Sequence, residues 1–395
     1  MKNLIKFLVI ILIILNAQTT RSQSGILLSE SGLSTALEKA KAEKKSVFLM
    51  CYMSWCPHCK KMMTKVFKDT AVADFYNRNF ICVAQDMGKG DGINLLKSLK
   101  INSFPTFVFY DSNAECIYRI AGELTANEFV QQGKNALNPQ KQLPYLKKQF
   151  DTDTSNADKC LSYLTTLKKA QLDFSGVVSR YFSTQTEGQL LTEKNWRIIA
   201  NGTTDINSRE FQFVLHHQKE YSSIASPERV SRKIFYLVKE ILNPLVESKD
   251  SLNYFNCRKS VTAIHLFSID SLVFTLDLKL YDLLNNWKAY QETTLQSTST
   301  YVWNDYMQLA TIATNYLKNI NDTNALTQAV RWTQRALVLN EDYNSCLLGS
   351  RLYQKASRIS DAIQMAQQGK KIAIKYGWDA TEVDSLLIDL QRIKK

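Results

Sequence analysis

Residues 54–60 read Ser-Trp-Cys-Pro-His-Cys-Lys, a stretch that holds two cysteines three positions apart, with a proline and a histidine between them. Such a pair can serve as a structural disulfide, as part of a metal site or as a reversible dithiol. A disulfide between Cys56 and Cys59 would close so short a loop that it would add little stability. A closed zinc site needs four ligands, commonly two such pairs, and the sequence contains no second pair. We therefore favour the reversible dithiol, and we expect no metal and no cofactor.

The residues around the pair predict how the two thiols differ. A β-rich run precedes the motif, and Pro57 suits the first turn of a helix that continues through residues 60–67. Cys56 would then lie at the helix N-terminus, where free backbone N–H groups and the helix dipole stabilise a thiolate over a thiol. His58, in the same turn, adds a hydrogen-bond donor. We expect Cys56 to be the attacking thiol and Cys59, three residues on along the same helix face, to be the resolving thiol.

Residues 23–138 alternate between helical and strand patterns. The spacing of Thr35 and Glu38 predicts a capping box before a helix over residues 36–45, and the spacing of Thr125 and Glu128 predicts a second capping box before the last helix. This alternation predicts an α/β domain with a central mixed sheet flanked by helices. The predicted strands are residues 46–52, 80–84, 107–110 and 116–120, and a further short helix is predicted over residues 93–100.

Two motifs in this region resemble those of the thioredoxin family. Residues 55–60 match its W-C-x-x-C-K motif after the central strand, and Phe104-Pro105, followed by a threonine, matches its cis-proline loop. The resemblance implies that Pro105 is cis and that the backbone beside Phe104 pairs with an extended substrate next to the cysteines. Trp55 and Pro57 would belong to the same substrate-binding surface. The family activity would be exchange of thiols and disulfides with protein substrates and with a redox partner that the sequence does not identify.

Two departures from the family pattern bear on this chemistry. Thioredoxins carry a buried aspartate six residues before the first cysteine, where this chain has Met50. Proton transfer from the resolving thiol must therefore use water, His58 or another group. The Pro-His dipeptide is that of strongly oxidising periplasmic members, but a dipeptide alone does not decide between oxidase, reductase and isomerase. The alternative is a redox-passive binding or scaffold protein whose helical part docks a partner.

Residues 139–395 follow a different pattern. Apolar residues recur there at spacings of three and four, which is typical of amphipathic helices. Ala329 and Ala362 lie 33 residues apart and each open such a helix, a spacing close to that of tetratricopeptide repeats. We predict an all-α, helical-repeat-like domain, tetratricopeptide-like near residues 305–375, that docks a partner and is not catalytic. The whole layout resembles a multidomain thioredoxin family of exported proteins in Bacteroidetes-type bacteria.

Residues 1–22 predict a secretory signal peptide. Lys2 and Lys6 flank the start of an apolar run over residues 7–15, and small and polar residues follow. The run is too short to span a bilayer comfortably, and no later stretch approaches 18 uninterrupted apolar residues. We expect a periplasmic or otherwise exported protein that is not an integral membrane protein after cleavage. An uncleaved membrane anchor is the alternative.

Charge and cysteine content limit the partners further. The net charge of +12 comes from basic residues spread among acidic ones, which indicates a solvated basic surface and no nucleic-acid partner. Eight cysteines in 395 residues are far too few for a disulfide-stapled scaffold. We therefore expect buried free thiols at the six positions outside the motif, Cys51, Cys82, Cys116, Cys160, Cys257 and Cys346.

Overall fold

The computed structural model describes residues 25–394 of the chain. The chain divides into two compact units, residues 1–226 and residues 227–395. The signal peptide predicted over residues 1–22 lies outside the described residues. Within residues 25–394, no helix is both long and apolar enough to cross a membrane.

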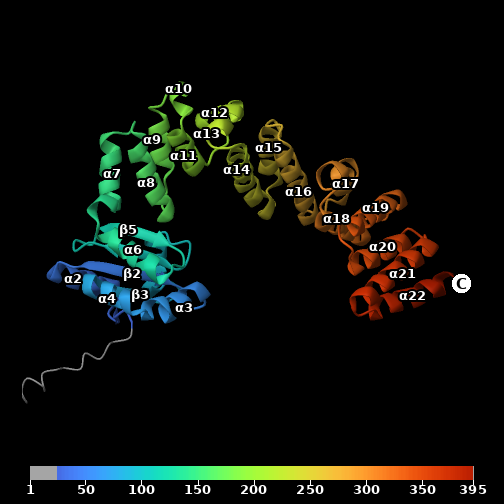
Figure 1. The fold of residues 1–395 in the computed structure, drawn as a ribbon, viewed down its shortest axis with the longest axis horizontal. Coiled ribbons are helices and arrows are strands. Elements are labelled where there is room, and N and C mark those ends of the chain that lie inside the picture. Colours follow the sequence, from blue (N-terminus) through green and yellow to red (C-terminus); the bar gives the residue numbers. More distant parts are fainter. Residues whose placement is uncertain (1–24, 395) are drawn as a thin grey trace, which may run out of the picture. The chain divides into compact units, whose positions relative to one another are not determined.

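A five-stranded mixed sheet forms the centre of the first unit (Figure 1). Its strands are β1 (Leu28–Ser29), β2 (Ser46–Tyr52), β3 (Phe80–Asp86), β4 (Thr106–Tyr110) and β5 (Cys116–Ala121), in the order β1-β3-β2-β4-β5. Strand β3 runs parallel to β1 and β2, whereas β4 is antiparallel to β2 and β5. The predicted α/β class and mixed sheet are confirmed. The short edge strand β1 is an addition to the four predicted strands.

Helices cover both faces of this sheet. They are α2 (Gly32–Glu43), α3 (Pro57–Thr64), the short 3-10 helix η1 (Val66–Lys68), α4 (Thr70–Asn79), α5 (Gly92–Ser98) and α6 (Ala126–Leu137). Phe48 and Met50 of β2 face a core that α3, α4 and α6 share, while Val47 and Leu49 face a core that α2 and α5 share. Successive residues of a strand point to opposite faces, so a strand covered on both sides is apolar throughout.

Phe48 lies at the centre of an aromatic cluster that joins the sheet to its helices. The Tyr76 ring of α4 stacks on the Phe129 ring of α6 with their centroids 4.3 Å apart, and the Tyr76 hydroxyl donates to the Phe129 carbonyl at 2.8 Å. The cluster therefore fixes α4 and α6 on one face of β2. The rings whose centroids lie within 6.0 Å of that of Phe48 are those of Phe67, Tyr76, Phe107, Phe109 and Phe129.

Two helix boundaries differ from the prediction. Helix α2 begins at Gly32, so Thr35 lies inside the helix and does not cap it. The helix after the cysteine motif ends at Thr64, before the 3-10 helix η1. A separate helix, α4, begins after Asp69, whose side chain caps it. The capping box predicted for α6 is present.

The first unit continues beyond α6 as a helical segment. Its helices are η2 (Pro139–Lys141, a 3-10 helix), α7 (Leu143–Thr152), α8 (Ala157–Lys169), α9 (Ser175–Phe182), α10 (Glu187–Leu190), α11 (Glu193–Gly202), α12 (Arg209–His216) and α13 (Gln218–Ile224). Helices α7 and α8 pack beside β5. Part of the helical region thus belongs to the same compact unit as the sheet, and the domain boundary at residues 138 and 139 stays a prediction.

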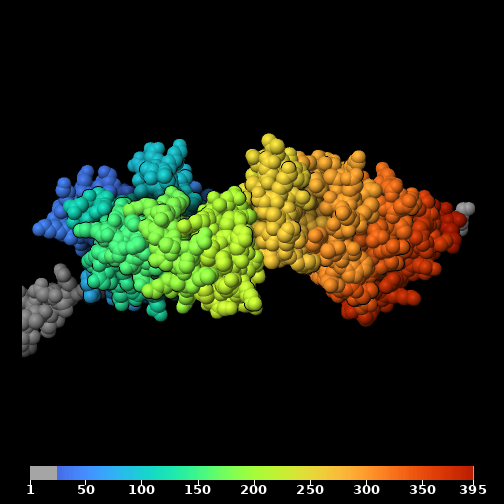
Figure 2. All heavy atoms as spheres, turned by 90° about the horizontal axis from the view of Figure 1, so that it is seen from above, coloured from blue at the N-terminus to red at the C-terminus, as the bar shows by residue number. Residues whose placement is uncertain are grey.

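The second unit contains helices only, among the residues described. They are α14 (Pro227–Glu247), α15 (Ser251–Thr262), α16 (Phe267–Leu283), α17 (Trp287–Tyr301), α18 (Tyr306–Asn319), α19 (Thr323–Leu339), α20 (Tyr343–Lys355), α21 (Ile359–Tyr376) and α22 (Thr381–Lys394). Coloured yellow to red, they follow one another in chain order (Figure 2). This confirms the predicted all-α region.

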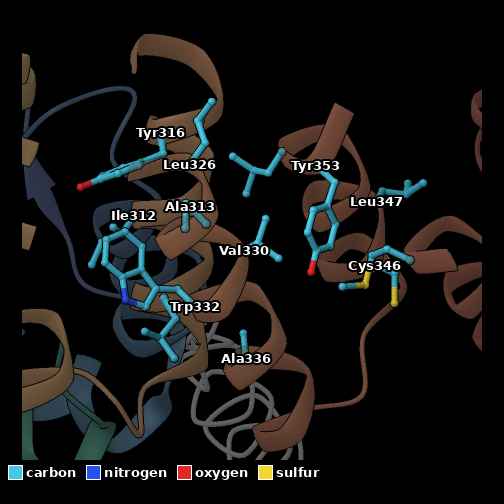
Figure 3. Packing of buried hydrophobic residues seen from close by; sticks show 14 of the residues in the cluster. Ile312, Ala313, Tyr316, Leu326, Val330, Trp332, Ala336, Cys346, Leu347 and Tyr353 are labelled. Carbon is cyan, nitrogen blue, oxygen red and sulfur yellow. The ribbon is translucent and has the colours of Figure 1, made fainter. Parts of the chain in front are cut away.

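The C-terminal helices share one core (Figure 3). Tyr316 and Trp332 are buried in it with their ring centroids 5.0 Å apart. Ala329 and Ala362, which mark the predicted repeat, are both fully buried in the same core. Membership of the tetratricopeptide class stays a prediction.

All eight cysteines are free thiols, as predicted for the six outside the motif. Cys116 and Cys257 are half-buried, and the other four of the six are buried. Burial raises the pKa of Cys51, Cys82, Cys160 and Cys346 to about 12, so these thiols stay protonated at neutral pH.

Replacing Phe48 with alanine should lower the free energy of unfolding of the first unit by about 3–5 kcal/mol, because it leaves a cavity at the centre of the aromatic cluster. Urea unfolding followed by circular dichroism measures this change. The control is Ile93→Ala in α5 of the same unit, since that residue is 45% exposed. The control should change stability by no more than about 0.5 kcal/mol. Equal effects of the two substitutions would contradict the central role of Phe48.

Candidate active site

The two cysteines of the motif lie at the N-terminus of α3. Cys56 has an extended backbone, with φ −76° and ψ 115°, and its Sγ accepts a hydrogen bond from the Cys59 N–H at 3.2 Å. Pro57 occupies the first helical position, where its missing N–H costs no hydrogen bond. The two Sγ atoms lie 2.6 Å apart, with Cys59 donating to Cys56. Cys56 is thus the acceptor of the pair and Cys59 the donor.

Cys59 is enclosed by the core beneath α3 and is only 1% exposed. Burial, and after it the hydrogen bond to Cys56, raises the pKa of the Cys59 thiol to about 12. Met50 is fully buried in the same core, and its side chain offers no proton acceptor comparable to a carboxylate. In the reduced protein Cys59 therefore stays a thiol at neutral pH.

The loop before β4 lies beside Cys56. Its Phe104–Pro105 peptide bond is cis, as the family resemblance implied. The Phe104 carbonyl oxygen lies 3.7 Å from Cys56 Sγ, and the Pro105 carbonyl accepts a hydrogen bond from the Gly122 N–H at 2.8 Å. Two segments 48 residues apart in the sequence thus bring Cys56, Cys59, Phe104 and Pro105 together.

His58 and Trp55 lie at the solvent side of the motif. The Trp55 side chain is a large exposed apolar group, at 74% exposure. The His58 side chain is 64% exposed, and its Nδ1 lies 2.7 Å from a carboxylate oxygen of Glu123. Sequence reasoning expected His58 to bond the Cys56 thiolate, whereas its hydrogen bond in the structure is to Glu123.

Glu123 follows β5 and holds two side chains of α3. It forms an ion pair with Lys61 in addition to its bond with His58. Hydrogen bonds from Lys61, and after it from His58, hold the pKa of the Glu123 carboxyl below its ordinary value. Glu123 therefore stays ionised at neutral pH and ties the end of β5 to the helix that carries the cysteines.

The helical segment also reaches this site. The Ser103 hydroxyl donates to Oε1 of Gln171, in the turn between α8 and α9, at 2.7 Å. The sequence analysis singled out none of Ser103, Glu123 and Gln171. Each lies outside the motifs, and their contacts join residues 65 and 68 positions apart, so no local pattern marks them.

Metal binding has no support from the described side chains. Across residues 25–394, no group of three or more His, Cys, Asp or Glu side chains could hold a metal ion.

A family model described as a thioredoxin-like domain matches residues 33–137. The chain contains a thioredoxin-like domain. Protein disulfide-isomerase A5 of Mus musculus is 37% identical over 68 residues, which are 17% of this chain and 13% of the relative. The thiol:disulfide interchange protein DsbD of Vibrio cholerae is 33% identical over 104 residues, which are 25% of this chain and 17% of the relative. The chain thus spans less than a fifth of either relative's length.

A solved structure also matches part of the chain. It is a solution structure from Bacteroides thetaiotaomicron, assigned provisionally as a disulphide-isomerase, and it is 36% identical in sequence. The match covers 29% of this chain and 95% of that one, with a TM-score of 0.28. The helices beyond the thioredoxin-like domain lie outside the residues that the family model matches.

Iodoacetamide at neutral pH should alkylate Cys56 before Cys59 in the reduced protein. Both thiols are buried, with Cys56 4% and Cys59 1% exposed, but the pKa of about 12 keeps Cys59 protonated, and only the thiolate reacts. Peptide mapping by mass spectrometry after brief exposure measures the order. In variants that keep one of the two motif cysteines, Cys56→Ala should react at least about tenfold more slowly at Cys59 than Cys59→Ala does at Cys56. Preferential labelling of Cys59 would contradict the assignment of the two thiols.

Proposed function

We propose that this protein is an exported thiol-disulfide oxidoreductase that exchanges disulfides with protein substrates through Cys56 and Cys59. The supporting observation is the thiol pair at the N-terminus of α3, with its sulfurs 2.6 Å apart, beside the cis Phe104–Pro105 bond. The names of the relatives, a disulfide-isomerase and an interchange protein, fit this reaction class. The apolar run over residues 7–15 and the lysines before it support export.

The exchange takes place in two steps. The Cys56 thiolate attacks one sulfur of a substrate disulfide, which forms a mixed disulfide and releases the other substrate sulfur as a thiolate. Cys59 then gives up its proton and attacks the Cys56 sulfur. This forms the Cys56–Cys59 disulfide and releases the second substrate thiolate, so two electrons pass to the substrate. A separate redox partner must reduce the pair again, and the reverse sequence oxidises a substrate dithiol.

Deprotonation of Cys59 is the demanding part of this cycle. Burial keeps its proton in place, and Met50 stands where thioredoxins carry an acid. We propose His58, which Glu123 holds by Nδ1, as the side chain that exchanges this proton with solvent. Its exposed position next to Cys59 in the chain suits that role.

The substrate-binding surface in this proposal consists of Trp55, Pro57, Phe104 and Pro105. An extended substrate segment would pair with the backbone at Phe104, whose carbonyl lies beside Cys56 Sγ. The exposed Trp55 ring supplies apolar area that substrate binding would remove from water.

Replacing Cys59 with alanine should trap protein substrates, because the mixed disulfide on Cys56 then has no resolving thiol. Non-reducing gels of extracts should show adducts that dithiothreitol removes and that the Cys56→Ala, Cys59→Ala double variant lacks. The wild-type protein should also accelerate insulin reduction by dithiothreitol. A rate equal to that of the double variant would favour the redox-passive binding protein, an alternative that the replacement of the buried acid by Met50 supports.

We propose that the second unit, residues 227–395, docks a protein partner and takes no part in the chemistry. A chain ending at Ser226 keeps the whole first unit, in which the cysteines, the cis-proline loop and Gln171 lie. This chain should be alkylated at Cys56 at the full-length rate, while it yields fewer trapped adducts in the Cys59→Ala background. Circular dichroism checks that the shortened chain is folded. Slower alkylation in a folded chain would show that the second unit helps to build the site.

A further inference from the structure

We propose that Gln171, in the turn between α8 and α9, is a positioning residue that holds the Ser103-Phe104-Pro105 loop for pairing with a polypeptide substrate. The inference rests on the proposed disulfide exchange at Cys56 and adds the helical segment to that site. The contact should affect the reaction with extended protein substrates, which pair with the loop, and not the reaction with small disulfides, which do not.

Gln171 contacts the residue that precedes Phe104 in the loop. The Ser103 hydroxyl donates to Gln171 Oε1 at 2.7 Å, and the Ser103 carbonyl accepts from the Thr106 hydroxyl at 2.8 Å. Ser103 directly precedes Phe104, whose carbonyl oxygen lies 3.7 Å from Cys56 Sγ. A bond that fixes Ser103 therefore fixes the backbone that a substrate segment would meet beside the attacking sulfur.

The backbone conformation of Gln171 also bears on the role of its side chain. Its φ of 52° is left-handed, and the Leu172 N–H bonds back to the Leu167 carbonyl at 2.9 Å, which closes the end of α8 as a Schellman motif. Glycine is the preferred residue at this position, because a Cβ makes the left-handed conformation costly. The helix end alone would favour glycine. A glycine at this position would thus fit the helix end, and the side-chain bond that the glutamine adds is to Ser103.

The start of the loop is held by the sheet and not by the turn that carries Gln171. Lys100 starts the loop, and its carbonyl accepts a bond from Arg119 of β5 at 3.3 Å. Arg119 thus attaches the start of the loop to β5, whereas Gln171 attaches the end next to Cys56 to the helical segment.

Gln171→Gly distinguishes the side-chain contact with Ser103 from the role of Gln171 in ending α8. It removes the contact and at the same time relieves the left-handed backbone. The KM for insulin in the dithiothreitol assay should rise about two- to tenfold, as expected for the loss of one hydrogen bond. The kcat, the rate with 5,5′-dithiobis(2-nitrobenzoic acid) and the Tm should not fall. Gln171→Glu keeps an acceptor oxygen and should retain the wild-type KM. In a Ser103→Ala background, Gln171→Gly should have no further effect.

The matched control is Lys249→Gly, at a residue after α14 that also has a left-handed φ, of 57°, and should leave the KM unchanged. An unchanged KM for Gln171→Gly in an active protein would overturn the inference alone. A slower reaction of the Gln171→Gly variant with the small disulfide, or an equal rise in KM for the Lys249→Gly control, would also overturn the inference. A wild-type protein that reduces neither insulin nor the small disulfide would overturn the proposed function, and the inference with it.

Discussion

Strand β2 is confined on both edges and both faces, and the position of the two thiols depends on this confinement. It pairs with β3 along its whole length and with β4 from Val47 to Cys51, and the residues from Val47 to Cys51 are fully buried. Only three residues separate the end of β2 from Cys56. The position of Cys56 is therefore fixed by β2. Cys56 lies beside the loop before β4 because β4 is the neighbour of β2 in the sheet.

Both thiols of the motif lie in one core, with Cys56 4% and Cys59 1% exposed, and a polar edge follows one helix turn on. Cys59 points into the core that contains Met50 and Phe48, where burial keeps it protonated. The next turn of α3 carries Lys61, and Glu123 brings a carboxylate to this face. The site therefore combines a proton that is difficult to remove with an ionised network a few residues away.

The sequence predicted those parts of the fold whose signals are local. The continuous apolar run predicted strand β2, and the capping box predicted the start of α6, because each signal lies within a few residues of the chain. Helix α4 was missed because only the short 3-10 helix η1 and the capping residue Asp69 separate it from α3, and no glycine or proline marks the break. The orientation of His58 could not be predicted, since an exposed side chain follows whichever partner the fold supplies, here Glu123 from 65 residues away.

Arg119 has a consequence for how the site can move. Its side chain lies in β5 at 3% exposure and donates to the carbonyls of Leu99 and Lys100, just beyond the end of α5. Among the described residues no carboxylate forms an ion pair with it, so the dipole of those carbonyls is its counter-charge. Lifting the loop from the sheet would leave a bare cation in an apolar interior. The start of the loop must therefore stay on the sheet, so that any movement of the loop is confined to its Ser103-Phe104-Pro105 end beside Cys56.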